Sequence, residues 1–529
     1  MDRRSFAIVE IVAIAGIVGV SAKATGEVPK MFAATLSFAK PAVVPVPEKL
    51  SYKDDVEVRL DAAQTMKVRC PDAAAAGWVR DHVRPWFGVE PKVVAETAAV
   101  ETAEEGYRLK AEPVGITLEA KTLQGIRYAM YTLRQVAERD SSGYKVTYYR
   151  LPELTVEDSP RLNFRGLHLC WFPEQSASYI ERAIRTAAAY KFNCVVLENW
   201  GVFQSERHTW FGWPNGPMTK AAIRRLVDVA RDVGVVLVPQ INVFGHASAS
   251  RSCTGKHAAL EFHPEMQSLF EPGGGKGGST SSAWNWCLSN PAAVETVKDL
   301  VVELHEAFGN PPYFHIGCDE ADPPSCANCR AADYTRLVAD YITDIGRLLA
   351  ARGARAMMWH DMLLRRGDPR WKGFYANGDE ALSKLPQMLP KDLVVCDWYY
   401  GSDPGGTQDP KGRTSLTGQY PTLDYFAKTC GFDTLTCPWE QPDGIRAQAK
   451  YAADTRLFGV LETTWHHFGG TRFPQMIQIS ACGAWGRGEW LSNGHFATVW
   501  RQSAWDAKSP SYRESGWYDT QVSRDILGR

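Results

Sequence analysis

Eight short apolar runs alternate with helix-like segments between residues 159 and 495, and this alternation constrains the fold more than any other feature. Between the runs, apolar residues recur at helical spacing, as at Ile180, Ile184 and Ala187. Strands that alternate with helices predict a parallel sheet, and eight repeats predict an α/β fold of the (β/α)8 TIM-barrel class. The predicted strands are 164–170, 194–198, 235–244, 313–318, 355–360, 393–398, 433–437 and 458–464.

The regions outside this barrel have different patterns, and 529 residues are too many for one ordinary domain. Residues 50–158 combine strand-like runs with a helical stripe that includes Ile126 and Leu133, which predicts a small α+β domain ahead of the barrel. Residues 26–49 are rich in Pro and Ala and are interpreted as a linker, and residues 496–529 are interpreted as a polar C-terminal tail.

The N-terminus has the features of an export signal. Arg3 and Arg4 precede an apolar run of ten residues, 11–20, which ends close to small residues. Because this run is too short to span a bilayer, we interpret residues 1–25 as a signal peptide, with an uncleaved anchor as the alternative. The segment from Arg3 to Phe6 resembles a twin-arginine signal. The prediction is an exported protein, periplasmic or secreted, whose mature form has no membrane partner.

The charge balance narrows the class of ligand. The chain has 59 Lys and Arg against 60 Asp and Glu, a formal net charge of −1, which gives no electrostatic basis for binding nucleic acid or an anionic membrane. It also has 18 Trp residues, whose indole faces stack on sugars in some proteins and fill large cores in others. Composition therefore argues against nucleic acid as a partner and does not decide between those uses of Trp.

A TIM barrel gathers its reactive groups at the carboxyl ends of its strands, because the βα loops line that mouth. Acidic, aromatic and His residues follow nearly every predicted strand of this chain. Such a ring of side chains predicts a walled pocket for a neutral, hydroxyl-rich ligand. Its predicted members are Glu198, His246, Asp319, Glu320, Trp359, Asp361, Trp398, Tyr399, Tyr400, Trp439, Trp465, His466 and His467.

Asp319 and Glu320 are adjacent where the fourth predicted strand gives way to polar residues. At such an edge, neighbouring carboxylates can be held in different environments, so that one stays ionised while the other keeps its proton. Acid-assisted cleavage of a glycosidic bond requires that division of labour. The alternative is an ordinary Asp-Glu pair that caps the next helix, and the barrel around the pair favours the reactive interpretation.

The hexapeptide at residues 315–320 resembles the His-x-Gly-Gly-Asp-Glu signature of glycoside hydrolase family 20, the β-N-acetylhexosaminidases. Residues 50–158 are similar to the small zincin-like domain that precedes the barrel in many members, and residues 158–161 match the usual start of the barrel. Two strand ends depart from the family's commoner pattern. Residues 170–174 replace an Asp-x-x-x-Arg segment and residues 198–200 replace a His-rich one, so the chain is more similar to the hexosaminidase D branch, and the choice between gluco and galacto sugars stays open.

The resemblance implies an exo-acting retaining hydrolase that removes terminal β-linked GlcNAc or GalNAc from glycans, with no cofactor and no metal. In that mechanism the acetamido oxygen of the substrate attacks the sugar in place of a protein carboxylate. Glu320 would be the acid and base, and Asp319 would orient the acetamido group. The implied binding residues are the walls Trp359, Trp398, Trp439 and Trp465, the donor Tyr399 or Tyr400, the supporting His246 and His315, and the hydroxyl ligands Glu198 and Asp361.

Two other functions remain open at this point. One is a barrel glycosidase of the two-carboxylate type, in which Glu320 pairs with Glu198 or Glu440 and the 2-substituent of the sugar is unimportant. The other is a catalytically silent carbohydrate-binding protein that retains the barrel. The altered end of the first strand permits the silent protein, whereas the intact pair of Asp319 and Glu320 argues against it.

Twelve cysteines lie at irregular positions. Cys326 and Cys329 form the only CxxC motif, and a structural zinc would need two further ligands that are not obvious nearby in the sequence. A loop disulfide or a pair of free thiols is therefore the prediction. The possible disulfides in an exported protein are Cys253–Cys287 and Cys430–Cys437. The cysteines in apolar stretches, predicted to be buried thiols, are Cys170, Cys194, Cys318, Cys396 and Cys482.

Overall fold

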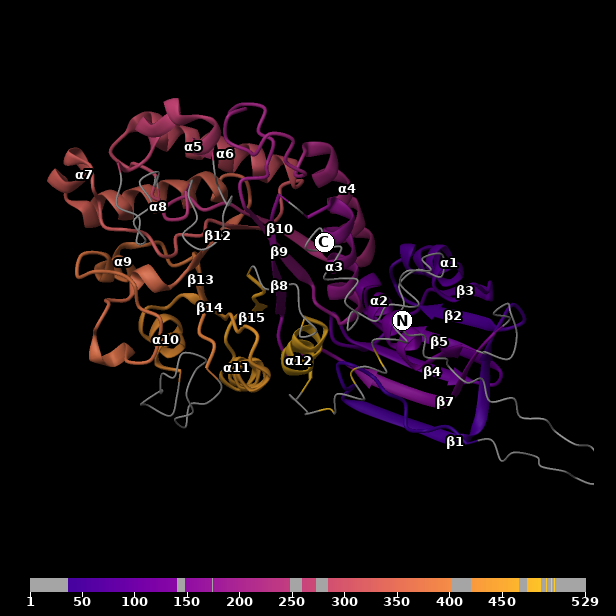
Figure 1. Ribbon diagram of the computed structural model, residues 1–529. Helices are drawn as coiled ribbons and strands as arrows, with labels where there is room; N and C mark the ends of the chain where they lie inside the picture. The colour runs from indigo at the N-terminus through magenta and orange to yellow at the C-terminus, as the bar shows by residue number, and fades with distance from the viewer. Residues whose placement is uncertain are drawn as a thin grey trace, which may run out of the picture.

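The computed structural model describes residues 37–139, 148–173, 175–247, 259–272, 284–401, 420–465, 473–486, 491, 496 and 499. Its two parts, a small N-terminal domain and a barrel, lie side by side (Figure 1). The predicted signal peptide, residues 26–36 of the predicted linker and nearly all of the predicted tail lie outside the described residues, as do Cys253, His466 and His467. Within the described part of the chain, no helix has the length and apolar character needed to cross a bilayer.

A seven-stranded sheet and two helices build the N-terminal domain, which confirms the predicted α+β class. The strand order is β1-β7-β4-β5-β2-β3, with β6 paired to β7, and the parallel pairs of this sheet are β2–β3 and β2–β5. The predicted stripe on α2 is buried at Ile126 and Leu133. The elements are β1 (Lys49–Leu60), β2 (Thr65–Arg69), α1 (Ala74–Phe87), β3 (Lys92–Glu96), β4 (Tyr107–Glu112), β5 (Gly115–Glu119), α2 (Leu123–Val136), β6 (Glu138–Arg139) and β7 (Tyr149–Asp158).

All eight predicted barrel strands are present, and they close into a parallel barrel in sequence order (Figure 1). Two of them end three or more residues earlier than predicted, at Gln240 and at His315. After His315, the backbone of Gly317 and Cys318 takes positive φ angles of 67° and 79°, which cannot continue a strand. The strands are β8 (Phe164–Trp171), β9 (Cys194–Asn199), β10 (Val236–Gln240), β11 (Tyr313–His315), β12 (Arg355–Trp359), β13 (Val394–Asp397), β14 (Asp433–Thr436) and β15 (Gly459–Glu462).

Long helices cover the barrel after most of its strands. The predicted apolar stripe on the first of them is buried, as Ile180, Ile184 and Ala187 show. After β12 and β13, the described residues form only short helical segments, among them α9 (Leu385–Met388) and α10 (Pro421–Asp424). The long helices are α3 (Ala177–Ala189), α4 (Lys220–Val233), α6 (Pro291–Ala307), α8 (Tyr334–Ala350), α11 (Pro442–Thr455) and α12 (Phe473–Trp485).

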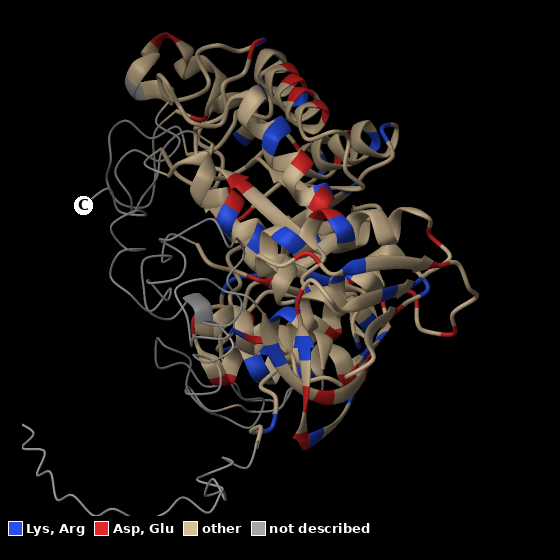
Figure 2. Ribbon diagram, turned by 90° about the vertical axis from the view of Figure 1, so that its right-hand side faces the viewer, with Lys and Arg blue, Asp and Glu red and all other residues tan. Residues whose placement is uncertain are grey.

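Basic and acidic residues are interspersed along the ribbon of the helices and the N-terminal domain (Figure 2). This distribution follows from the nearly equal numbers of acidic and basic residues.

The cysteines of the apolar stretches are buried free thiols, as predicted. Cys430 and Cys437 are also free, so the disulfide considered between them is not formed. The physical reason is that β14 lies between them, and a strand of four residues holds the Cα atoms of its two end residues about 10 Å apart. A disulfide needs Cα atoms closer than about 7 Å.

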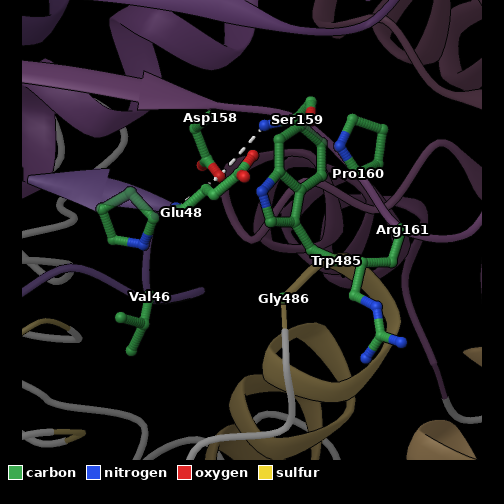
Figure 3. A pocket seen from close by; sticks show the side chains of 9 residues that line it. Val46, Glu48, Asp158, Ser159, Pro160, Arg161, Trp485 and Gly486 are labelled. Atoms are coloured by element: carbon green, nitrogen blue, oxygen red, sulfur yellow. Dashed lines mark hydrogen bonds between the residues drawn. The ribbon is translucent and has the colours of Figure 1, made fainter.

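A buried ion pair joins the two domains. Lys191, between α3 and β9, donates to Asp158 Oδ2 at 2.7 Å and to the hydroxyl of Tyr107 at 2.8 Å, and its Nζ lies 4.6 Å from the ring centre of Trp485. Burial lowers the pKa of Lys191, and the carboxylate of Asp158 opposes this shift. Asp158 Oδ1 also accepts two backbone N–H groups, drawn as dashed lines in Figure 3. Because Lys191 directly precedes a strand, the junction lies at the amino ends of the barrel strands, where side chains serve stability.

Replacing Lys191 with Met is expected to lower the free energy of unfolding by about 3–5 kcal/mol, because the carboxylate of Asp158 remains buried without its cation. The double variant Lys191→Met/Asp158→Asn is expected to recover much of this loss, since both buried groups are then neutral. Urea denaturation followed by circular dichroism measures the three proteins. The control is Lys49→Met at the Lys49–Glu157 pair, where the Lys side chain is 70% exposed and the free energy of unfolding is expected to change little. A Lys191→Met variant as stable as the control would contradict the prediction.

Candidate active site

The segment that follows β11 turns sharply and places Asp319 and Glu320 at the mouth of the barrel. A Cβ atom at Gly317 would collide with the side chain of Asn242, so this turn requires glycine. Left-handed backbone at residues other than glycine is uncommon and collects at functional sites. Five such residues follow the barrel strands, with their φ angles: His246 (55°), Cys318 (79°), Glu320 (47°), Glu440 (56°) and Trp465 (45°).

The two carboxylates have different environments, as predicted. The side chain of Asp319 is only 9% exposed, whereas that of Glu320 is 41% exposed. His246 lies beside both, with its Nε2 3.3 Å from Asp319 Oδ2 and 3.5 Å from Glu320 Oε2. The buried carboxylate is thus paired with a cation, and the more exposed one reaches toward solvent, where it can exchange a proton with a bound molecule.

His246 is held in place by aromatic rings. Its imidazole lies 4.1 Å from the ring centre of Trp284 and 5.8 Å from that of Trp200. Burial by itself would lower the pKa of this imidazole, but the carboxylates of Asp319 and Glu320 outweigh burial and raise the pKa to about 10. His246 is therefore a charged partner of the acid pair at neutral pH.

Asp361 lies behind Glu320 and supports its backbone. Asp361 Oδ2 accepts the backbone N–H of Glu320 at 3.0 Å and the side-chain amide of Asn377 at 2.8 Å. Its Oδ1 accepts the indole N–H of Trp398 at 3.4 Å. Burial raises the pKa of Asp361 to about 7, and the charge of Asp319 adds to the rise. Because Asp361 is fully buried, the predicted role as a ligand of substrate hydroxyls does not fit its position, and its hydrogen bonds hold the backbone of Glu320 and the indole of Trp398.

The predicted aromatic residues fall into two groups, four rings that contact one another and one ring that lies deeper in the barrel. Trp398 contacts Tyr400 and Trp465, with ring centres 5.8 and 6.3 Å away, and Tyr400 contacts Trp439 at 5.0 Å. Trp359 lies deeper: it is fully buried and packs on the rings of His315 and Trp465. Four of the predicted residues therefore form a contiguous aromatic surface, and Trp359 supports it from below.

The structure distinguishes between the two tyrosines that the sequence left as alternatives. Tyr399 packs against Phe374 and Tyr420, with ring centres 4.4 and 6.0 Å away, so it belongs to the core behind β13. Tyr400 packs with Trp398 and Trp439, and the charge of Glu320 is among the causes that raise its pKa, after burial and the nearby Tyr375. Tyr400 is thus the tyrosine that lies close to the acid pair.

Glu198 and His315 belong to the interior of the barrel. Glu198 is 1% exposed, and its carboxylate accepts from Asn242 Nδ2 at 3.0 Å and lies 2.9 Å from His168 Nε2. The predicted role of Glu198 as a hydroxyl ligand therefore does not fit its position. His315 is fully buried, its Nδ1 accepts the backbone N–H of Gly317 at 3.1 Å, and burial keeps its pKa well below the usual value. His315 thus shapes the turn beneath the acids, in agreement with a supporting role.

Comparison with known families is consistent with this geometry. The model named "Glycosyl hydrolase family 20, domain 2" matches residues 40–159, and "Glycosyl hydrolase family 20, catalytic domain" matches residues 139–402, which include Asp319 and Glu320. The chain belongs to glycoside hydrolase family 20. The resemblance carried by residues 315–320 is thereby confirmed, while the assignment to the hexosaminidase D branch stays a prediction.

Curated relatives and solved structures agree with the family. The chain is 24% identical over 374 residues to a beta-hexosaminidase of Porphyromonas gingivalis, covering 61% of this chain and 45% of the relative. A beta-hexosaminidase of Vibrio furnissii is 24% identical over 63% of this chain and 58% of its own length. The chain thus spans about half the length of these relatives. The solved exo β-N-acetylglucosaminidase of Vibrio harveyi superposes with a TM-score of 0.64 at 16% identity, covering 89% of this chain and 77% of that one, and supports the fold.

Sequence reasoning missed three residues of this family 20 site. Trp284 donates its indole N–H to the backbone oxygen of Glu320 at 2.8 Å and contacts the ring of His246. Asn377 donates to Asp361, and Tyr375 packs against Trp398 with ring centres 4.2 Å apart. All three lie in long loops, where no periodicity marks them. A concentration of Trp beside Asn in the third βα loop, at residues 284–286, was the available signal.

Replacing His246 with Gln is expected to lower the melting temperature in a pH-dependent way. The pKa of the imidazole is raised in the fold, so its charge stabilises the native state fully below the unfolded pKa of about 6.5, and this contribution is lost as pH rises toward about 10. The deficit of the variant is therefore greatest at pH 6 and disappears near pH 10. Thermal denaturation across this range tests it, with His263→Gln at a partly exposed site as the control. A deficit that does not change with pH would show that packing on Trp284, rather than charge, explains the loss.

Proposed function

We propose that this family 20 protein is an exo-acting retaining β-N-acetylhexosaminidase that removes terminal β-linked GlcNAc or GalNAc from glycans by substrate-assisted catalysis. The observation that carries the proposal is the pair of adjacent carboxylates in unlike environments, Asp319 buried beside His246 and Glu320 more exposed at the mouth. The printed names of the relatives, which include beta-hexosaminidases and a chitooligosaccharidolytic beta-N-acetylglucosaminidase of Bombyx mori, point to the same class.

In the first step of the proposed reaction, Glu320 donates its proton to the glycosidic oxygen as the bond from that oxygen to C1 breaks. The carbonyl oxygen of the substrate's acetamido group attacks C1 from the opposite face, and a cyclic oxazolinium intermediate forms. Asp319 accepts the acetamido N–H, which orients the group and stabilises the positive charge that develops on it. Tyr400 is proposed to donate a hydrogen bond to the acetamido oxygen.

In the second step, Glu320 is a carboxylate and removes a proton from water, which attacks C1 and opens the ring of the intermediate. The product is the free sugar with its original anomeric configuration, and Glu320 regains its proton. The aromatic surface of Trp398, Trp439 and Trp465 is proposed to contact the apolar face of the sugar. No protein carboxylate attacks the substrate in this scheme.

A panel of aryl β-glycosides that differ only at C2 and C4 tests the proposal. The 2-acetamido glycosides are expected to be hydrolysed, whereas the matched 2-hydroxy glycosides are expected to react at least about a hundredfold more slowly, because they lack the internal nucleophile. Comparing the two epimers at C4 assigns the preference for GlcNAc or GalNAc. Equal rates for 2-acetamido and 2-hydroxy glycosides would overturn substrate assistance. Binding of the sugars without turnover would instead identify a silent carbohydrate-binding barrel.

We also propose that the protein is exported to the periplasm or secreted, because Arg3 and Arg4 precede a short apolar run in residues 1–25. The relatives include a lacto-N-biosidase of Bifidobacterium bifidum as well as hexosaminidases, so related chains act on different glycans. Fractionation of cells that express the full chain, with and without the pair Arg3-Arg4 changed to Lys, tests export. Accumulation of both forms in the cytoplasm would contradict it.

A further inference from the structure

Four potential metal ligands converge beside the acid pair, in a part of the chain that the proposed reaction does not use. Cys326 and Cys329 follow Asp319 and Glu320 in the loop after β11, at the start of helix α7 (Ala327–Ala331). The loop between β10 and α6 brings Glu271 and Cys287 to the same place, and one ligand atom from each of the four residues lies within 4.8 Å of the others. The two further ligands that a CxxC zinc site needs are therefore present, 39 and 55 residues away from Cys326 in sequence.

The spacing of the sulfur atoms fits a metal better than a disulfide. Cys287 Sγ and Cys326 Sγ are 3.8 Å apart, and Cys287, Cys326 and Cys329 are all free. A disulfide needs about 2.05 Å between its sulfurs. Ligands bound tetrahedrally at about 2.3 Å from a zinc ion have neighbouring sulfurs about 3.8 Å apart. The observed separation is that of an edge of such a tetrahedron.

Hydrogen bonds from neighbouring groups fix the positions of the three cysteine sulfurs. Cys326 Sγ accepts the backbone N–H of Cys329 at 3.2 Å, a bond that supports a thiolate in a CxxC turn. Ser289 places its hydroxyl 3.2 Å from Cys329 Sγ and 3.5 Å from the other two sulfurs. Its O–H is thus positioned to donate to one of the thiolates.

Glu271 is a buried carboxylate with only one of its oxygens engaged. Its Oε2 accepts the backbone N–H groups of Ser325 and Cys326 at 2.8 and 2.6 Å. Its Oε1 is buried and has no hydrogen-bond partner among the described residues. A residue that is 4% exposed rarely leaves a carboxylate oxygen unpaired, because burial of an unsatisfied charged group is costly. A cation bound among the three sulfurs would satisfy this oxygen.

We propose that Glu271, Cys287, Cys326 and Cys329 bind a structural zinc ion. A set of three sulfurs and one carboxylate suits zinc rather than calcium or magnesium, which prefer oxygen ligands. All four positions are occupied by protein atoms, as in structural rather than catalytic zinc sites.

The zinc ion would fasten two loops that carry the active site. Close to the cluster, Asn285 and Asp322 exchange two hydrogen bonds, of 2.6 and 3.0 Å, between the same two loops. Next to Asn285, Trp284 contacts His246 and donates to the backbone oxygen of Glu320. Loss of the metal would therefore loosen the packing around Glu320 without removing any group that takes part in the reaction.

Elemental analysis of the full chain, purified without chelators, tests the proposal directly. The wild type is expected to hold about one zinc ion per chain. The double variant Cys326→Ser/Cys329→Ser is expected to lose it, whereas Cys430→Ser, at a partly buried cysteine outside the cluster, is expected to retain it. A second buried group of residues, His168, Cys170 and Glu198, could also bind a metal ion. Comparing the wild type with the double variant shows which of the two groups holds the zinc. Zinc that persists in the double variant would lie elsewhere and would overturn the proposal.

A measurement on the wild type keeps the test independent of whether the double variant folds. Protein freed of metal by a chelator is titrated with Co²⁺, which gives thiolate-to-cobalt charge-transfer absorption when cysteines are ligands, and Zn²⁺ is then expected to abolish that band. Chelation is also expected to lower the melting temperature, and zinc to restore it. Absence of the cobalt band, or a Cys287–Cys326 disulfide found by mass spectrometry of unreduced peptides, would overturn the proposal. None of these readouts depends on hydrolase activity.

Discussion

The Glu320→Gln variant is expected to lose about 10²–10⁴-fold in kcat on N-acetyl-β-hexosaminides while it folds as the wild type does. The amide cannot donate the proton that the leaving oxygen needs, and it cannot remove a proton from water in the second step. Folding should be preserved because the side chain is 41% exposed and because the backbone of Glu320, rather than its carboxylate, is bonded to Asp361 and Trp284. Steady-state kinetics and thermal denaturation measure the two parts of this expectation.

The leaving group makes the Glu320→Gln test specific for an acid. A dinitrophenyl glycoside has a leaving group that departs without protonation, so its first step should be affected less than that of an unsubstituted phenyl glycoside. Single-turnover measurements of phenol release compare the two. An equal loss for both substrates would show that the substitution disturbs binding or folding rather than proton donation.

Glu440→Gln is the matched control for the same experiment. Glu440 is also an acidic residue with left-handed backbone after a barrel strand, and it is the remaining partner for a two-carboxylate mechanism once Glu198 is placed inside the barrel. In the substrate-assisted mechanism, Glu440→Gln should keep activity within about tenfold of the wild type. A loss as large as that of Glu320→Gln would favour the two-carboxylate alternative.

The repeating strands and helices of the barrel were predictable from the sequence. Strand and helix periodicity located all eight barrel strands, because each buried strand is a continuous apolar run and each covering helix has one apolar face. The strand ends then located Asp319 and Glu320, since a barrel directs those positions to one mouth. The expectation that residues at strand ends face the mouth of the barrel was wrong for Glu198, which is buried. Side chains near the end of a strand alternate between the barrel interior and the mouth, and the sequence does not show which residue is the first to face the mouth.

The contributions of the long loops were not predictable in this way. Asp361 was correctly placed at a strand end, but its burial behind Glu320 depends on Asn377 and Trp398, which come from other segments. The CxxC motif was visible, whereas Glu271 and Cys287 reach it through the antiparallel bridge between Phe270 and Trp286. Such contacts are set by loop closure between distant segments, for which the sequence has no periodic signal.

Replacing Asp319 with Asn tests whether the substrate supplies its own nucleophile. The amide keeps the size of the carboxylate but loses its charge, so it no longer stabilises the cation that develops on the acetamido group. The expected loss is about 10²–10³-fold in kcat on 2-acetamido substrates, the range found when one group that stabilises charge in the transition state is removed. On 2-hydroxy substrates, whose slow hydrolysis has no acetamido group to stabilise, the variant is expected to match the wild type within about threefold.

Asp319→Asn also removes one of the two carboxylates that pair with the imidazole of His246. The loss of this ion pair therefore needs a control of its own. His246→Gln breaks the same pair but keeps the carboxylate of Asp319, so it separates the two effects. If Asp319 acts on the acetamido group, Asp319→Asn loses much more activity than His246→Gln, and its loss is confined to 2-acetamido substrates. If Asp319 serves only to hold His246, the two variants lose activity equally, and 2-hydroxy substrates are affected as much as the acetamido ones. Only the first pattern is compatible with a sugar amide that attacks its own anomeric carbon.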